Sequence, residues 1–159
     1  MRLFVIFKNS LLLPRNKALF YLNRVSVMET IVYMGCLMFF LFLPYIVKLI
    51  VNMEKTVSEL PNSIYLFQII VFYPFFILFF IVGGVSLLAV LSLGMNWLLK
   101  RKLTYQHLWK MTAYALTWPL IIYSVLILFE IRQTAVTLLP LVFCYTLLYR
   151  MILVYPKIG

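Results

Sequence analysis

Four stretches of the chain are apolar over a length that suits a membrane-spanning helix. They run from Thr30 to Val51, from Ile64 to Leu99, from Trp109 to Phe129 and from Ala135 to Val154. A transmembrane helix needs about 20 predominantly apolar residues, so each stretch is long enough to span a bilayer once. The pattern predicts an all-α protein: a polytopic membrane protein with a bundle of four transmembrane helices.

The first part of the chain, residues 1–28, is amphipathic instead. Apolar side chains share one broad helical face there, and these are Leu3, Phe4, Ile6, Phe7 and Leu11. Pro14 ends or redirects this helix, and a second short piece follows from Asn16 to Val25. Such a pattern is typical of a helix in the headgroup plane, with a partner-binding amphipathic helix as the alternative. We therefore expect an interfacial segment, 1–28, followed by a four-helix transmembrane domain, 29–159.

The second apolar stretch is longer than one membrane crossing requires. A straight helix from Ile64 to Leu99 would be about 54 Å long, whereas the hydrocarbon core is about 30 Å thick. The helix therefore either bends, with Pro74 and the pair Gly83-Gly84 as candidates, or projects beyond the membrane. A turn at the two glycines would make two spans. It would also place the basic triplet Lys100-Arg101-Lys102 on the outer face, against the positive-inside rule. We therefore favour one bent helix.

Each of the four expected spans contains one proline: Pro44, Pro74, Pro119 and Pro140. Proline kinks in the outer half of the bundle would form a shallow cavity between the helices, which is one hypothesis for function. Ala89, Ser92 and Asn96 recur at a spacing that places them on one helix face. Small and polar side chains of this kind are typical of helix–helix contacts in lipid, so we interpret the three as packing residues.

The charges predict the orientation, and four of the basic residues lie in a loop that we expect from Lys100 to Lys110. The chain has 159 residues, of which 65% are hydrophobic and 11% charged, and its net charge is +10. Basic residues flank the spans on one face: Arg15, Lys17, Arg24, Lys100, Arg101, Lys102 and Lys110, together with Arg2, Lys8, Arg150 and Lys157, against Lys48, Lys55 and Arg132 on the other face. The positive-inside rule places both termini in the cytoplasm, in a multi-pass protein of the cell membrane. Anionic headgroups, and not nucleic acid, are the partners that this charge implies.

The sequence offers no constellation for catalysis or for cofactor binding. It contains no Asp, its single histidine, His107, has no expected partner, and Cys36 and Cys144 both lie inside apolar runs. No metal-ligand spacing, phosphate-binding loop or nucleophile motif occurs. We therefore expect a protein that is not an enzyme and that holds neither a metal nor a cofactor.

Two segments resemble a known family. The stretch Tyr105–Pro119, which reads YQHLWKMTAYALTWP, and the start Phe7–Leu11 followed by Pro14 are similar to an uncharacterised bacterial family of multi-span membrane proteins. Its members are sometimes labelled maltodextrin-utilization proteins and are similar to Yip-type membrane proteins. They usually carry a sizeable extracytoplasmic insertion after the first span, which is reduced here to the short segment Asn52–Asn62. The resemblance implies a multi-span bacterial membrane protein and assigns no catalytic residues.

These observations favour a non-enzymatic accessory or scaffold protein that acts by helix packing with itself or with another membrane complex. The alternative is a small transporter or permease component whose cavity lies among the proline-kinked helices.

Overall fold

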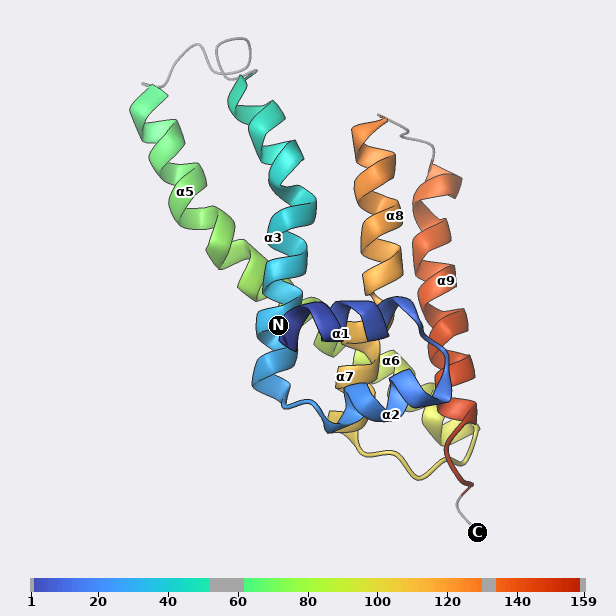
Figure 1. Ribbon diagram of the computed structural model, residues 1–159. Coiled ribbons are helices and arrows are strands. Elements are labelled where there is room, and N and C mark those ends of the chain that lie inside the picture. Colours follow the sequence, from blue (N-terminus) through green and yellow to red (C-terminus); the bar gives the residue numbers. More distant parts are fainter. Residues whose placement is uncertain (1, 52–61, 130–133, 158–159) are drawn as a thin grey trace.

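The computed structural model describes residues 2–51, 62–129 and 134–157, and this part of the chain is helical with short connections (Figure 1). The elements are α1 (Arg2–Leu11), α2 (Asn16–Arg24), α3 (Val27–Val51), α5 (Asn62–Phe79), the π-helical turn η1 (Phe80–Gly84), α6 (Val85–Leu98), α7 (Tyr105–Ala115), α8 (Thr117–Leu128) and α9 (Thr134–Leu153). The prediction of an all-α fold is confirmed. The segment Asn52–Asn62, which includes Lys55, lies outside the described residues except for Asn62. Arg132 also lies outside them.

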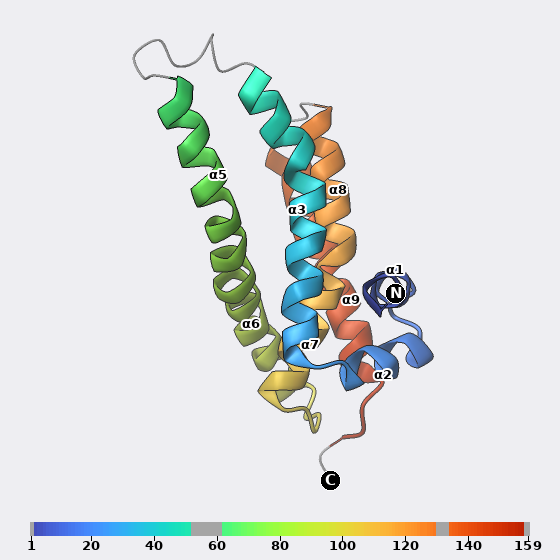
Figure 2. The same ribbon diagram turned by 60° about the vertical axis from the view of Figure 1, so that its left-hand side comes forward.

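Three of the described helices are long and apolar enough to cross a membrane. Their apolar cores run over Val27–Pro44, Val71–Leu98 and Tyr105–Leu128, and α9 contributes a shorter apolar stretch, Leu138–Leu153. The upper halves of α3, α5, α8 and α9 stand side by side in Figure 1, whereas α1 crosses the bundle and is seen end-on in Figure 2. Elements α2, α7 and the chain end occupy the lower half.

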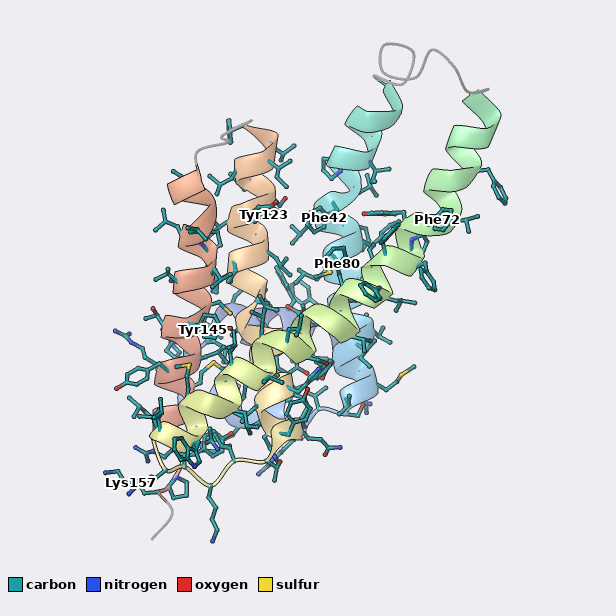
Figure 3. All side chains as sticks on the ribbon, turned by 180° about the vertical axis from the view of Figure 1, so that it is seen from behind. Phe42, Phe72, Phe80, Tyr123, Tyr145 and Lys157 are labelled. Carbon is teal, nitrogen blue, oxygen red and sulfur yellow. The ribbon has the colours of Figure 1, made fainter. Side chains whose placement is uncertain are left out.

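The second apolar stretch forms one continuous helical path, α5–η1–α6, which starts at Asn62 and ends at Leu98. Seen from behind in Figure 3, it runs obliquely across the bundle, with Phe72 and Phe80 on its length. Its one departure from α-helical bonding is the π-turn Phe80–Gly84, which contains Gly83-Gly84, while Pro74 lies within α5. The π-turn therefore lies at one of the two places where the sequence predicted a bend.

Helix α3 begins at Val27, three residues earlier than the sequence pattern predicts, because a capping box starts it. The Ser26 hydroxyl accepts a hydrogen bond from the Glu29 backbone N–H (3.1 Å), and the Glu29 carboxylate accepts one from the Ser26 backbone N–H (3.3 Å). These reciprocal bonds satisfy donors that a helix start otherwise leaves unpaired. The capping box fixes the entry of α3 beside α2.

The third apolar stretch also begins earlier than expected. We expected a loop from Lys100 to Lys110 and a helix from Trp109, but α7 already starts at Tyr105. A turn at Leu116 then separates α7 from α8. Pro119, which has no N–H to continue the helical ladder, falls in the first turn of α8, where that N–H is not needed. Consequently the second half of the expected loop is helical, and Lys110 lies inside a helix.

Helix α7 is the centre of the lower half. Every residue from Leu108 to Ala115 is buried, and α2, α3, α6 and α9 all pack around it. From α9, the buried side chains Leu148, Met151 and Ile152 belong to the same hydrophobic core. Because this short helix is buried on all sides, its polar side chains must form hydrogen bonds to the neighbouring helices.

Candidate functional site

The buried polar side chains of α7 form hydrogen bonds to three surrounding helices, α2, α3 and α6. The indole N–H of Trp109 donates to the Ser86 hydroxyl of α6 at 3.1 Å. One turn further on, the hydroxyl of Thr112 lies 3.3 Å from that of Ser92 on α6. These two contacts fix α6 against α7 along the face of α6 that carries the small residues.

Two further hydroxyl pairs join α7 and α8 to α3. The Tyr114 hydroxyl lies 2.7 Å from that of Thr30, and the Thr117 hydroxyl lies 2.8 Å from that of Tyr33. Thr30 also donates to the carbonyl of Ser26 at 2.9 Å. Since that bond uses the only hydroxyl hydrogen of Thr30, Tyr114 is the donor in the pair it forms with Thr30. All four side chains of these pairs are buried.

Lys110 is the most unusual residue of this centre, because its side chain is only 8% exposed. Its ammonium donates to the carbonyls of Asn23 (2.5 Å) and Val25 (3.0 Å), which lie at the C-terminal end of α2. The carbonyls at a helix end carry partial negative charge and have no partner within the helix. Lys110 therefore caps α2 from the centre of the fold.

Helix α1 is attached in the same way, through a helix-terminal carbonyl. The indole N–H of Trp118, on α8, donates to the carbonyl of Leu11 at 3.1 Å. Leu11 is the last residue of α1, so this bond satisfies one of its unpaired carbonyls. Both N-terminal helices are thus bonded at their C-terminal ends to the α7–α8 segment.

The end of the chain meets α2 and the α6–α7 connection at the lower end of the bundle, where Figure 3 labels Lys157. The Arg101 guanidinium donates to the carbonyl of Tyr155, and Arg101 forms an antiparallel bridge with Lys157. The amide of Asn23 donates to the Tyr155 hydroxyl. Burial raises the pKa of Tyr155, and the hydrogen bond from Asn23 acts in the opposite direction.

A Schellman motif ends α6 at the start of this connection. Lys100 has a positive φ of 48°, its N–H donates to the carbonyl of Trp97 (3.1 Å), and the Arg101 N–H donates to the carbonyl of Asn96 (3.2 Å). This is the left-handed position that glycine usually occupies. The turn directs the basic triplet away from the helix axis.

A cavity of about 380 Å³ opens between α1, α2 and the start of α3. It is lined by Arg2, Ile6, Tyr21, Arg24, Val25 and Glu29. Arg2 and Glu29 form an ion pair across it, with Nη1 and Oε1 3.0 Å apart. Basic side chains from two helices, Arg2 of α1 and Arg24 of α2, converge on this open volume.

The predicted surface residues differ in their burial, from exposed to buried. Arg15, Lys17, Arg24, Lys100 and Lys102 are exposed, whereas Arg101 is half-buried and Lys110 is buried. Ala89, Ser92 and Asn96 are all buried on the face of α6 that packs on α7. Of the prolines, Pro44 and Pro74 are exposed, and Pro119 and Pro140 are buried.

Sequence reasoning missed two features of this centre. It treated Lys110 as a basic residue of a surface loop, although the apolar residues on both sides of it, Leu108 and Met111, are typical of a buried helix. It also overlooked the spacing of Ser26 and Glu29, which is the signature of a capping box. Among the residues that the structure describes, no three His, Cys, Asp or Glu side chains are grouped so that they could hold a metal ion.

The fold and the buried centre define an all-helical protein with helices long and apolar enough to cross a membrane. Residues 59–152, more than half of the chain, match the family described as "Protein of unknown function (DUF1189)". The chain belongs to this family, and the resemblance to an uncharacterised family is confirmed to that extent. The match includes the whole of α7 and α8. Neither the curated proteins nor the solved structures gave a match.

Proposed function

We propose that this chain is a non-enzymatic accessory or scaffold protein of the cell membrane that acts by helix packing. Its four spans are α3, the α5–η1–α6 helix, α7–α8 and α9, with α1 and α2 at the membrane surface. The Leu99–Thr104 connection, α2 and the C-terminal residues gather at one end of the bundle (Figure 1) and carry six basic residues: Lys17, Arg24, Lys100, Arg101, Lys102 and Lys157. The positive-inside rule then favours a cytoplasmic location for both termini. We include in this proposal that the chain is similar to Yip-type membrane proteins.

The exposure of α5 is the observation that carries this proposal. Helix α5 packs on α3, where the Tyr73 hydroxyl donates to the Phe39 carbonyl at 3.2 Å. Beyond this contact it exposes bulky aromatic side chains in several directions, and these are Phe67, Phe72, Phe75, Phe76 and Phe79, followed by Phe80 in η1. In lipid, helices associate by packing, and an apolar helix with one neighbour offers its free faces to a further helix.

The centre of the fold supports a structural role. The buried polar side chains of α7 and α8 bond to α2, α3, α6 and α1, so their hydrogen-bonding groups join helices together. Such bonds rigidify the lower half of the bundle. A rigid base with one free helix is suited to holding a partner in a fixed position.

Site-specific photo-crosslinking tests the proposal. A photoreactive phenylalanine analogue replaces Phe75 on α5, which is 66% exposed, or Leu139 on α9, which is 61% exposed. Both positions are exposed and apolar, so lipid contact alone would affect them equally. We expect a single protein adduct of defined mass from position 75, in stoichiometric yield, and lipid adducts from position 139. Lipid adducts alone from both positions would contradict the proposal.

The alternative, a small transporter or permease component, is favoured by one observation. The α3–α5 pair and the α8–α9 pair diverge in the half of the bundle that contains Pro44 and Pro140 (Figures 1 and 3). Between α3 and α8 the structure holds a cavity of about 10 Å³ beside Ser124, enough for about one water molecule. Labelling of a cysteine placed at Leu128 by a membrane-impermeant reagent, in a background without Cys36 and Cys144, would favour this alternative.

A further inference from the structure

The cavity between α1, α2 and the start of α3 has an apolar floor and a charged rim. Ile6 and Val25 are buried and form the floor, while Arg2, Arg24 and Tyr21 are exposed. Three helices contribute to it, and Figure 2 shows α1 and α2 together on one side of the bundle. Its volume of about 380 Å³ lies at the lower end of the range for ligand sites, which suits a small polar group.

The single carboxylate of the cavity is already fully engaged. Oε1 of Glu29 accepts from Arg2 (3.0 Å), and Oε2 accepts from the backbone N–H and the hydroxyl of Ser26, both at 3.3 Å. The guanidinium of Arg24, in contrast, forms neither a hydrogen bond nor an ion pair within the part of the chain that the structure describes. The cavity therefore has an excess of positive charge, and the free guanidinium supplies the planar donor fork that matches a phosphate.

An exposed apolar side chain lies next to the charged rim. Met28, which precedes Glu29 and follows Val25 by three residues in the chain, is 69% exposed, and the ring of Tyr21 in the rim is 42% exposed. Arginines next to exposed apolar side chains are typical of the boundary between headgroups and acyl chains. A free anion in water would need the charges but not these apolar neighbours.

We propose that the cavity lined by Arg2, Tyr21, Arg24 and Glu29 binds the phosphate of one anionic phospholipid headgroup. The guanidinium of Arg24 holds the phosphate, the remaining N–H groups of Arg2 and the Tyr21 hydroxyl contact the headgroup, and the acyl chains lie outside along Met28. The inference rests on the membrane placement of the proposed function. Bound lipid would tie α1 and α2 to the membrane at one defined position.

Binding is measured on the purified full chain in mild detergent with short-chain phosphatidylglycerol, short-chain phosphatidylcholine and inorganic phosphate as separate ligands. We expect one phosphatidylglycerol per chain, bound about tenfold more tightly than the other two ligands. The excess positive charge of the cavity repels the choline cation of phosphatidylcholine, and inorganic phosphate has no acyl chains to contact the apolar side chains. Equal binding of phosphatidylcholine would overturn the proposal. Equal binding of inorganic phosphate would identify a free-phosphate site and also overturn it.

Three variants locate the site. Arg24→Gln should weaken phosphatidylglycerol binding about tenfold, whereas the matched control Arg150→Gln, an exposed arginine at the other end of the chain, should leave it unchanged. Glu29→Gln should strengthen binding about threefold, since it removes the negative charge while a glutamine still completes the capping box. A misfolded variant cannot produce this gain. Equal losses in Arg24→Gln and Arg150→Gln would show diffuse charge attraction and contradict the assigned site.

The lipid assay needs no protein partner, so its outcome is independent of the crosslinking experiment on α5. Phosphatidylglycerol binding without an adduct from position 75 would contradict only the scaffold role. An adduct from position 75 without a lipid preference would contradict only the lipid site.

Discussion

The ammonium of Lys110 lies 2.5 Å from the carbonyl oxygen of Asn23, 87 residues away in the sequence. This contact joins the central helix α7 to the end of α2 and uses a buried charge to do so. The charge is stabilised by two carbonyls at a helix C-terminus, where the helix dipole is negative.

Replacing Lys110 by methionine should release α2. The variant leaves the Asn23 and Val25 carbonyls without their donor, at a cost of about 1–3 kcal/mol in unfolding free energy. Amide hydrogen exchange in residues 16–25 should accelerate, while exchange in α8 and α9 should change little. The matched control is Lys102→Met, since Lys102 is exposed. Unchanged exchange of α2 in Lys110→Met would contradict the capping role.

Replacing Lys100 by glycine should stabilise the protein. Lys100 occupies the left-handed position of the Schellman motif with φ 48°, where an L-residue with a side chain costs about 1 kcal/mol relative to glycine. The expected gain in unfolding free energy is therefore about 0.5–1 kcal/mol, measured by denaturant titration in detergent. Lys102→Gly, two residues further on and without a positive φ, should not stabilise. A loss of stability in Lys100→Gly would contradict this assignment.

The hydroxyl pair of Thr30 and Tyr114 should show an energetic coupling. Tyr114→Phe removes the donor of a buried hydrogen bond and should cost about 1 kcal/mol. A double-mutant cycle with Thr30→Val isolates the pair, and we expect a coupling energy of about 0.5–1 kcal/mol. Tyr123→Phe on the exposed side of α8 serves as the control. Strictly additive losses would show that the two hydroxyls do not interact.

The proposed topology predicts which positions a membrane-impermeant thiol reagent can reach. Arg101 and Lys157 form a bridge, so cysteines placed at Lys102 and at Lys157 should lie on one side of the membrane. In intact cells both should stay unlabelled and then react after permeabilisation, in a background of Cys36→Ser and Cys144→Ala. Labelling of either position in intact cells would overturn the cytoplasmic location of the termini.

The helices could be predicted from the sequence because their lengths follow from uninterrupted apolar runs. The predicted ends of the long helix, Ile64 and Leu99, agree with the observed Asn62 and Leu98 to within two residues. Apolar composition is enough to predict the helix and its ends, since backbone N–H and C=O groups in an apolar environment must form their hydrogen bonds within the helix.

The centre could not be predicted because its contacts join residues far apart in the chain. Thr30 and Tyr114 are 84 residues apart, and nothing in either local pattern identifies the other as its partner. Lys110 has the same charge as its exposed neighbours in the α6–α7 connection, and only the position of α2 distinguishes them. The cavity at Arg24 likewise depends on how α1 and α2 dock onto α3.

The bond between Trp118 and Leu11 sets an order of events during synthesis. The carbonyl of Leu11 can bond to the indole of Trp118 only after another 107 residues have been synthesised. Likewise, the carbonyl of Asn23 in α2 can bond to Lys110 only after another 87 residues. At about 5–20 residues per second, this delay lasts about 5–20 seconds. During that time the first two helices are made and Arg2 can already pair with Glu29, but the carbonyls at their C-terminal ends lack these two donors. The beginning of the polypeptide therefore completes its contacts only after the third apolar stretch has been made.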